Sequence, residues 1–143
     1  MAKIELNNSQ LRTIQSALDM YLRIGIGQFT VIKDHPTFQK HLSNLFQDKN
    51  GKTDYNVYHK FRDMADNTLT EGRNILIREL NKGTNASWGI NHQSVDESCR
   101  EAHDIIQVIR HEFWKQNENR SNITVDSSVH LISAGTENIK VEL

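Results

Sequence analysis

The most regular hydrophobic pattern in the chain lies between Ser94 and Gln116. Its apolar residues recur at alternating spacings of four and three: Val95, Cys99, Ala102, Ile106, Ile109 and Phe113. This spacing places them in one stripe of an α-helix, which has to be buried. Ser94 and Glu97 have the spacing of a capping box, so the pattern predicts that the helix begins at Ser94. The opposite face is polar apart from one valine: Arg100, Asp104, Gln107, Val108 and His111.

A second helical pattern predicts a long first helix from Leu11 to about Ile32. Its second half conflicts with this prediction, because Gly25 and Gly27 stand among β-branched residues. A glycine inside a helix costs about 1 kcal/mol relative to alanine, so we expect another backbone or a ligand to approach closely there. A phosphate-binding loop is the alternative, but no strand precedes the two glycines and no third glycine follows. Tight helix packing is therefore the favoured interpretation.

Two further helices are predicted, from Thr37 to Phe46 and from Tyr55 to Leu80. Pro36 separates the first helix from the second, because proline cannot continue the helical hydrogen-bond ladder. The segment Gln47–Asp54 between the two is rich in turn residues. The sequence Asn81–Gly83 provides a C-terminal stop with the expected glycine.

Short apolar runs near both termini predict strands, at Lys3–Leu6 and within about 122–143. Ser133 to Asn138 has the composition of a hairpin loop. We therefore expect a mainly α fold, in which long amphipathic helices carry a small antiparallel β-sheet built from the N- and C-terminal segments. A length of 143 residues fits one helical domain over residues 1–143. The expected core includes Leu11, Ile14, Leu18, Phe61, Cys99, Ile106 and Ile109.

Composition limits the partners that the chain is expected to bind. Hydrophobic residues make up 36% of the chain, which predicts a modest core completed by subunit contacts in a homo-oligomer. A net charge of -1 provides no overall basic field, so nucleic acid is not an expected partner. No signal-peptide pattern and no run of 18 apolar residues occurs, so we expect no membrane partner and a cytoplasmic location.

No motif in the sequence predicts catalysis, a metal or a cofactor. Cys99 is the single cysteine, which fits a reducing compartment. It could act as a nucleophile, but its place on the apolar stripe favours an inert buried thiol. His111 and Glu112 begin like the zinc-protease helix motif, but Lys115 occupies the position of the second histidine. The paired Glu-x-x-Glu clusters that magnesium-dependent helical pyrophosphohydrolases use are also absent, so we expect a protein that is not an enzyme.

Residue types that commonly bind ligands occur on the loop before the long C-terminal helix and on the flank of that helix. Trp88 and His92 lie on the loop, and Arg110 lies beside the apolar stripe. Aromatic rings and arginines are the groups that stack on a base and hold a phosphate. The structural alternative is that Trp88 fills the core and that Arg110 caps a carbonyl or pairs with an acid. The complete predicted ligand site comprises Arg73, Arg78, Trp88, His92, Arg110, Gly25 and Gly27.

Two parts of the chain resemble a family of small proteins of T-even-type tailed phages that have no characterised function. The resembling segments are Leu18–Phe29, and Ser87–Ile90 followed by Ala102–His111. The resemblance implies a phage protein that works in the cytoplasm of the bacterial host. By analogy, small phage proteins of this size include host-takeover factors and sponges that sequester nucleotide immune signals.

These observations lead to two functional hypotheses. The first is a non-catalytic, homo-oligomeric binding protein that sequesters a small anionic, nucleotide-like ligand. The alternative is an interaction factor that binds and modulates a host protein, with Val108 and Trp114 as its surface anchors.

Overall fold

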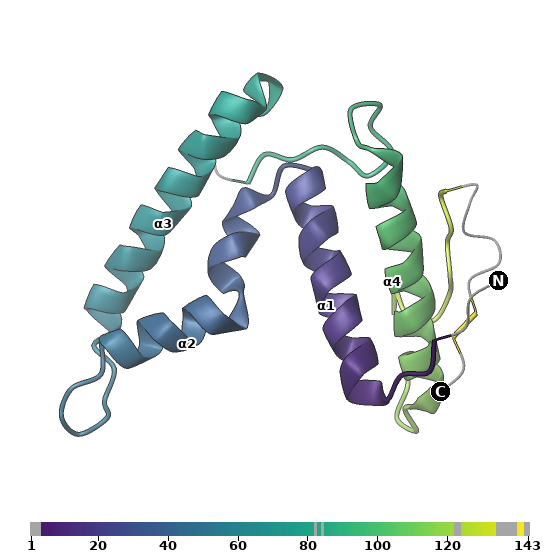
Figure 1. The fold of residues 1–143 in the computed structure, drawn as a ribbon, viewed down its shortest axis with the longest axis horizontal. Coiled ribbons are helices and arrows are strands. Elements are labelled where there is room, and N and C mark those ends of the chain that lie inside the picture. The colour runs from purple at the N-terminus through teal and green to yellow at the C-terminus, as the bar shows by residue number, and fades with distance from the viewer. Residues whose placement is uncertain (1–3, 82, 84, 122–123, 134–139, 142–143) are drawn as a thin grey trace. The chain divides into compact units, whose positions relative to one another are not determined.

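The computed structural model describes residues 4–81, 83, 85–121, 124–133 and 140–141. The fold is mainly α-helical, as the sequence predicts (Figure 1). Its helices, including the 3-10 helices η1 and η2, are α1 (Asn8–Gly25), η1 (Phe29–Asp34), α2 (Pro36–Leu45), α3 (Tyr55–Leu76), η2 (Arg78–Leu80) and α4 (Glu97–Gln116). The chain divides into two compact units. Unit 1 comprises Met1–Ile26 and Gly89–Leu143, and unit 2 comprises Gly27–Trp88. The single-domain organisation stays a prediction.

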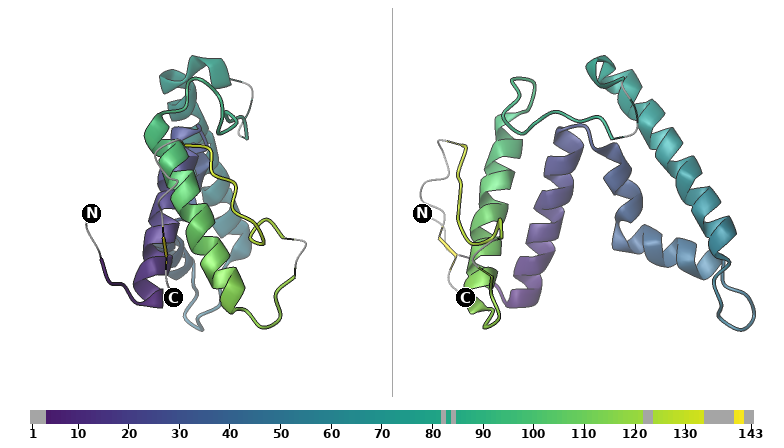
Figure 2. Two further views of the ribbon diagram at one scale, coloured as in Figure 1. Left: turned by 90° about the vertical axis from the view of Figure 1, so that its right-hand side faces the viewer. Right: turned by 180° about the vertical axis from the view of Figure 1, so that it is seen from behind.

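Unit 1 is built on an antiparallel pair of helices, α1 and α4, which lie side by side in Figures 1 and 2. Near the end of α1 and the start of α4, the Tyr21 hydroxyl and Ser98 Oγ are 2.6 Å apart. At the same end, a Cβ on Gly25 would overlap the Sγ of Cys99. The predicted tight helix packing at Gly25 is therefore confirmed.

The apolar stripe of α4 forms the core of unit 1. Cys99 and Ala102 are each 3% exposed and Ile109 is 1% exposed. Of the seven residues predicted for the core, Leu11, Cys99, Ile106 and Ile109 are buried. Leu18 is half-buried. The prediction is wrong for Ile14 and Phe61, which are 37% and 42% exposed.

The helix starts are set by local hydrogen bonds. Asn7 caps α1 in a capping box with Gln10, in which each side chain accepts from the other residue's backbone amide at 2.9 Å. The predicted start of α4 at Ser94 is wrong, because Asp96 is the N-cap and accepts from the Ser98 amide at 2.9 Å. Glu97 instead accepts hydrogen bonds from Ser133 and Arg100.

The predicted first helix to Ile32 is also wrong, because α1 ends at Gly25. Gly27 has a φ of +91°, a conformation in which an L-residue with a Cβ would be strained. The chain then continues as η1. The two glycines that conflicted with a continuous helix therefore mark its end.

The predicted β-sheet is not found, since the described residues contain only an isolated bridge between Gln47 and Thr53. The described part of the C-terminal segment, 124–133, instead runs along α4 (Figure 1). The carboxylate of Asp104, fully buried, accepts from the backbone amides of Ile132 and Ser133 at 2.7–3.0 Å. Most of the predicted hairpin loop, at 134–138, lies outside the described residues.

Unit 2 consists of η1, α2, α3 and η2, with α3 packed on the two 3-10 helices. Arg62 of α3 forms an ion pair with Asp34 of η1 at 2.6 Å. The Tyr58 hydroxyl donates to Gln39 of α2 at 2.6 Å. Polar side chains thus contribute to the contact between these elements, beside the ring contact of Phe46 with Phe61. Over the described part of the chain, no helix has the length and apolar character needed to cross a membrane.

Candidate functional site

Arg73, a predicted ligand residue in unit 2, is a structural residue. Its side chain is 1% exposed. Its guanidinium donates to the carbonyls of Ala86 at 2.8 Å and Leu80 at 3.1 Å, and also to that of Gly83. These bonds tie the segment after η2 to α3. The guanidinium is therefore used within the protein and does not face a ligand.

The other predicted residues of unit 2 differ from Arg73 in exposure and contacts. Arg78 is exposed and Trp88 is half-buried. A Cβ on Gly27 would overlap Cδ1 of Leu80, so this glycine permits contact with η2. The close approach expected at Gly27 is made by the chain itself.

The predicted residues of unit 1 are separated along α4. His92 is exposed before the helix, and its Nδ1 accepts from the Ser94 amide at 3.2 Å. Arg110 lies thirteen residues into the helix from Glu97, a rise of about 20 Å. Gly25 is adjacent to Cys99, at the His92 end. These residues therefore do not line one site.

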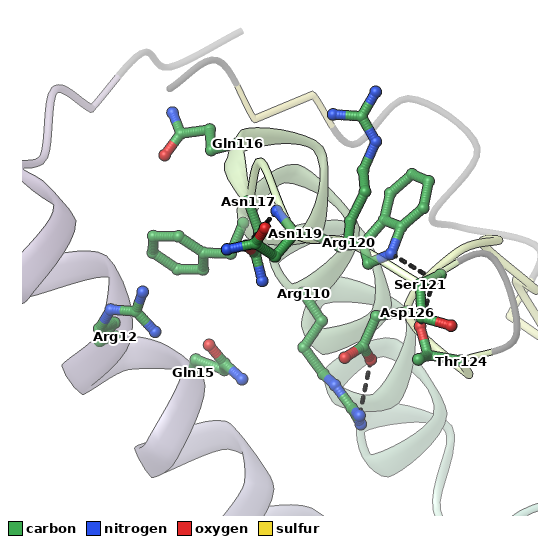
Figure 3. A pocket seen from close by; sticks show the side chains of 12 residues that line it. Arg12, Gln15, Arg110, Gln116, Asn117, Asn119, Arg120, Ser121, Thr124 and Asp126 are labelled. Carbon is green, nitrogen blue, oxygen red and sulfur yellow. Dashed lines mark hydrogen bonds and ion pairs between the residues drawn. The ribbon is translucent and has the colours of Figure 1, made fainter.

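Arg110 does line a recess, at the opposite end of the α1–α4 pair. The recess has a volume of about 720 Å³. Its walls come from α1, from the last turns of α4 and from the segment that follows α4 (Figure 3). It is lined by Arg12, Gln15, Arg110, Phe113, Trp114, Gln116, Asn117, Asn119, Arg120, Ser121, Thr124 and Asp126. Of the predicted ligand site, this recess contains Arg110 alone.

Three arginines enter the recess from three parts of the chain. Arg12 of α1 places its Cζ 4.0 Å from the ring centre of Phe113. Arg110 of α4 forms an ion pair with Asp126, with 2.6 Å between Nη2 and Oδ1 (Figure 3). Both partners are about one-third exposed, so solvent screens the pair and reduces its contribution to stability. Arg120 places its Cζ 5.4 Å from the ring centre of Trp114 and donates to the Lys115 carbonyl at 2.9 Å.

Trp114 lines the recess and holds the segment that follows α4 in place. Its indole Nε1 donates to the Ser121 carbonyl at 2.9 Å (Figure 3). The ring of His111 stacks on the indole with 5.4 Å between centroids, and His111 Nδ1 lies 2.8 Å from the Asp126 carbonyl oxygen. These contacts fix the segment after α4 against the helix and hold Arg120 and Asp126 at the recess.

The recess has an excess of positive charge. Its lining includes three guanidinium groups and one carboxylate, that of Asp126. The amide side chains of Gln15, Gln116, Asn117 and Asn119 add neutral donors and acceptors. Guanidinium and amide groups around an open recess are suited to an anion, and guanidinium binds phosphate oxygens in pairs.

Sequence reasoning identified Arg110 and placed Trp114 near it but did not find Arg12 or Arg120. Arg12 lies on α1, and its position next to Phe113 depends on how α1 packs on α4. Arg120 follows the end of α4 and folds back over Trp114. Arg110 and Trp114 are four residues apart, which places them on the same face of a helix. This spacing is the local sequence signal for the face of α4 that lines the recess.

The described residues form no cluster suited to a metal ion. No group of three or more His, Cys, Asp or Glu side chains comes together there in a way that could hold a metal. Cys99 is buried, and desolvation raises the pKa of its thiol, which disfavours the reactive thiolate. The alternative of a surface anchor at Val108 is wrong, because this side chain is 9% exposed.

Comparison with known proteins gave no match to a family model, to a curated protein or to a solved structure.

Proposed function

We propose that the chain is a non-catalytic binding protein that holds a small, phosphate-bearing anion in the recess at the end of the α1–α4 pair. One observation carries the proposal: Arg12, Arg110 and Arg120 come from three segments and line a recess with a single carboxylate. Arg110 is already paired with that carboxylate. A bound phosphate would add a second acceptor for it and would give Arg12 and Arg120 an acidic partner.

Arginine side chains already cover the two aromatic rings that line the recess. The rings of Phe113 and Trp114 each have an arginine over them. Stacking of a base on Trp114 would require Arg120 to move. The proposal therefore concerns the anionic group of the predicted nucleotide-like ligand and assigns no base.

A thermal-shift panel tests the proposal, with inorganic phosphate, pyrophosphate, nucleoside triphosphates and cyclic dinucleotides. A ligand present at 100 times its Kd adds about 2.7 kcal/mol to the free energy of unfolding. For a chain of this size this corresponds to a rise of roughly 5–10 °C in Tm. No rise with any of these anions would refute the proposed function.

Two arginine variants locate the effect. Arg12→Gln removes a recess charge without leaving a carboxylate unpaired, because its partner is the Phe113 ring. Arg23→Gln is the matched control, since Arg23 lies on the same helix but pairs with Asp19 outside the recess. We expect Arg12→Gln to weaken anion binding about tenfold or more, and Arg23→Gln to leave it unchanged.

A further inference from the structure

Unit 2 buries very little apolar side chain for its length. Among its described residues, Leu80 is the single buried hydrophobic side chain, and Thr70 and Arg73 are the buried polar ones. Folding of such a segment requires apolar burial to offset the lost conformational entropy. Other large hydrophobic side chains of unit 2 are half-buried, and eight are exposed: Phe38, Leu45, Tyr55, Val57, Phe61, Met64, Ile75 and Leu76.

Four of these exposed residues lie along one face of α3. Val57, Phe61, Met64 and Ile75 follow spacings of four, three and eleven residues, which align on an α-helix. We call these four residues the α3 stripe. Their exposed fractions range from 37% to 76%. Within unit 2, Phe61 of the stripe contacts Phe46, with 4.8 Å between ring centroids. α3 packs on η1 through other residues, including Arg62, so much of the stripe stays exposed.

We propose that the α3 stripe docks against the α3 stripe of a second copy, in an antiparallel helix pair. Taking 150–250 Å² for a large side chain, the exposed parts of the stripe amount to roughly 400 Å² of apolar surface. A stable dimer interface buries about 800 Å² per partner, of which a little over half is apolar. The stripe therefore supplies about the apolar area that one partner of a dimer contributes.

The charges beside the stripe favour a second copy in this orientation. Lys60 is exposed near the start of α3 and Glu71 is exposed near its end. A two-fold axis between antiparallel helices brings opposite ends together, so the lysine of each copy approaches the glutamate of the other.

Gly72 supports a close approach at the same face. It lies three residues before Ile75, beside the stripe. A Cβ built at this position would meet no atom of the chain within 4 Å. A mid-helix glycine lowers helix propensity, and no close contact with the rest of the described residues explains it. A second helix packed against α3 would explain it, since glycine allows backbones to approach.

Sedimentation equilibrium on the full chain tests the proposal. We expect a mass twice the 16.5 kDa of one chain. Met64→Asp should weaken the dimer at least 100-fold, because it places a charge in the pairing face, whereas Ile4→Asp should not, since Ile4 is exposed in unit 1. Gly72→Gln should also dissociate the dimer while keeping the helical circular dichroism, because the added side chain enters open space within one chain.

A thiol probe gives a second measurement that does not depend on a destabilised variant. Cys99 is buried and is the single cysteine, so Met64→Cys introduces one accessible thiol. A short bismaleimide should link two copies through it and should not link copies that carry Ile4→Cys. A monomeric mass, a dimer unaffected by Met64→Asp, or a Met64→Cys thiol shielded within a monomer by another part of the chain would each overturn the proposal.

Discussion

The buried side chains of Arg73 and Asp104 form hydrogen bonds with backbone groups and are therefore not available to bind a ligand. Arg73 donates to carbonyls of the segment after η2, and Asp104 accepts from amides near the C-terminus. Each satisfies backbone groups that a sheet or helix would otherwise pair. At the level of single residues, the distinction between a binding arginine and a structural one therefore rests on burial and on the partner.

Arg73→Lys tests this structural role. Lysine keeps the charge but lacks the planar fork that reaches several carbonyls at once. We expect the free energy of unfolding to fall by about 2–3 kcal/mol, because buried carbonyls lose their donors. Urea denaturation followed by circular dichroism measures this change. Arg78→Lys, at an exposed position, is the control and should change the stability by less than about 0.5 kcal/mol.

The hydrogen bonds of Glu97 predict that the free energy of unfolding decreases at acid pH. Hydrogen bonds from the Ser133 hydroxyl and from Arg100 lower the pKa of its carboxyl below the ordinary value of 4.5. A lowered folded-state pKa stabilises the protein above the unfolded pKa, and this contribution is lost as the pH falls through the folded pKa. The free energy of unfolding should therefore decrease below about pH 4.5.

The contribution of Glu97 can be separated from that of other carboxyls. Ser133→Ala removes the hydroxyl hydrogen bond that contributes most to the lowered pKa of Glu97. Its unfolding free energy, measured by urea titration at several pH values, should decrease less steeply in acid than that of the wild type. An identical slope for the two proteins would contradict this assignment.

At the scale of elements, the contact between α1 and α4 at Gly25 is specific to glycine. An alanine there would place its Cβ against Cys99 Sγ. Gly25→Ala should therefore destabilise unit 1 by about 1–3 kcal/mol, as over-packing does, even though alanine favours a helix. Thermal unfolding of the purified variant measures the change.

A double variant shows whether this clash is the cause. Cys99→Ala removes the Sγ atom, so Gly25→Ala should cost less when combined with it than in the wild type. Equal costs in the two backgrounds would place the effect elsewhere in α1.

The sequence predicted elements well where one periodic stripe decides the packing, as in α4. It failed where a partner is remote in sequence. Asp104 was placed on the polar face of the predicted helix, but its burial was not predicted, because the amides that it binds lie 28 and 29 residues later. Phe61 was predicted as core because it follows the helical pattern of α3, yet it is 42% exposed and contacts Phe46, with 4.8 Å between ring centroids. The hydrophobic periodicity of a helix does not reveal contacts that its residues make with segments outside that helix.

At the scale of the whole molecule, most of the candidate site could not be predicted, because its residues come together from segments that are remote in sequence. Arg110 was found because it borders the stripe of α4. Arg12 and Arg120 become part of the same recess only through the packing of α1 and the return of the chain after α4. The residues predicted around Trp88 belong to the two different units, and the recess lies wholly in unit 1.

The two tryptophans of the chain provide the most direct test of the recess. Trp114 lines it, whereas Trp88 belongs to unit 2. In a ¹H–¹⁵N correlation spectrum of the labelled protein, the two indole N–H signals can be assigned with Trp88→Phe. Titration with the phosphate-bearing anion that raises Tm most should move the Trp114 signal in a saturable way and leave the Trp88 signal in place. A saturable shift of Trp88 alone, or of neither indole, would contradict binding in the recess.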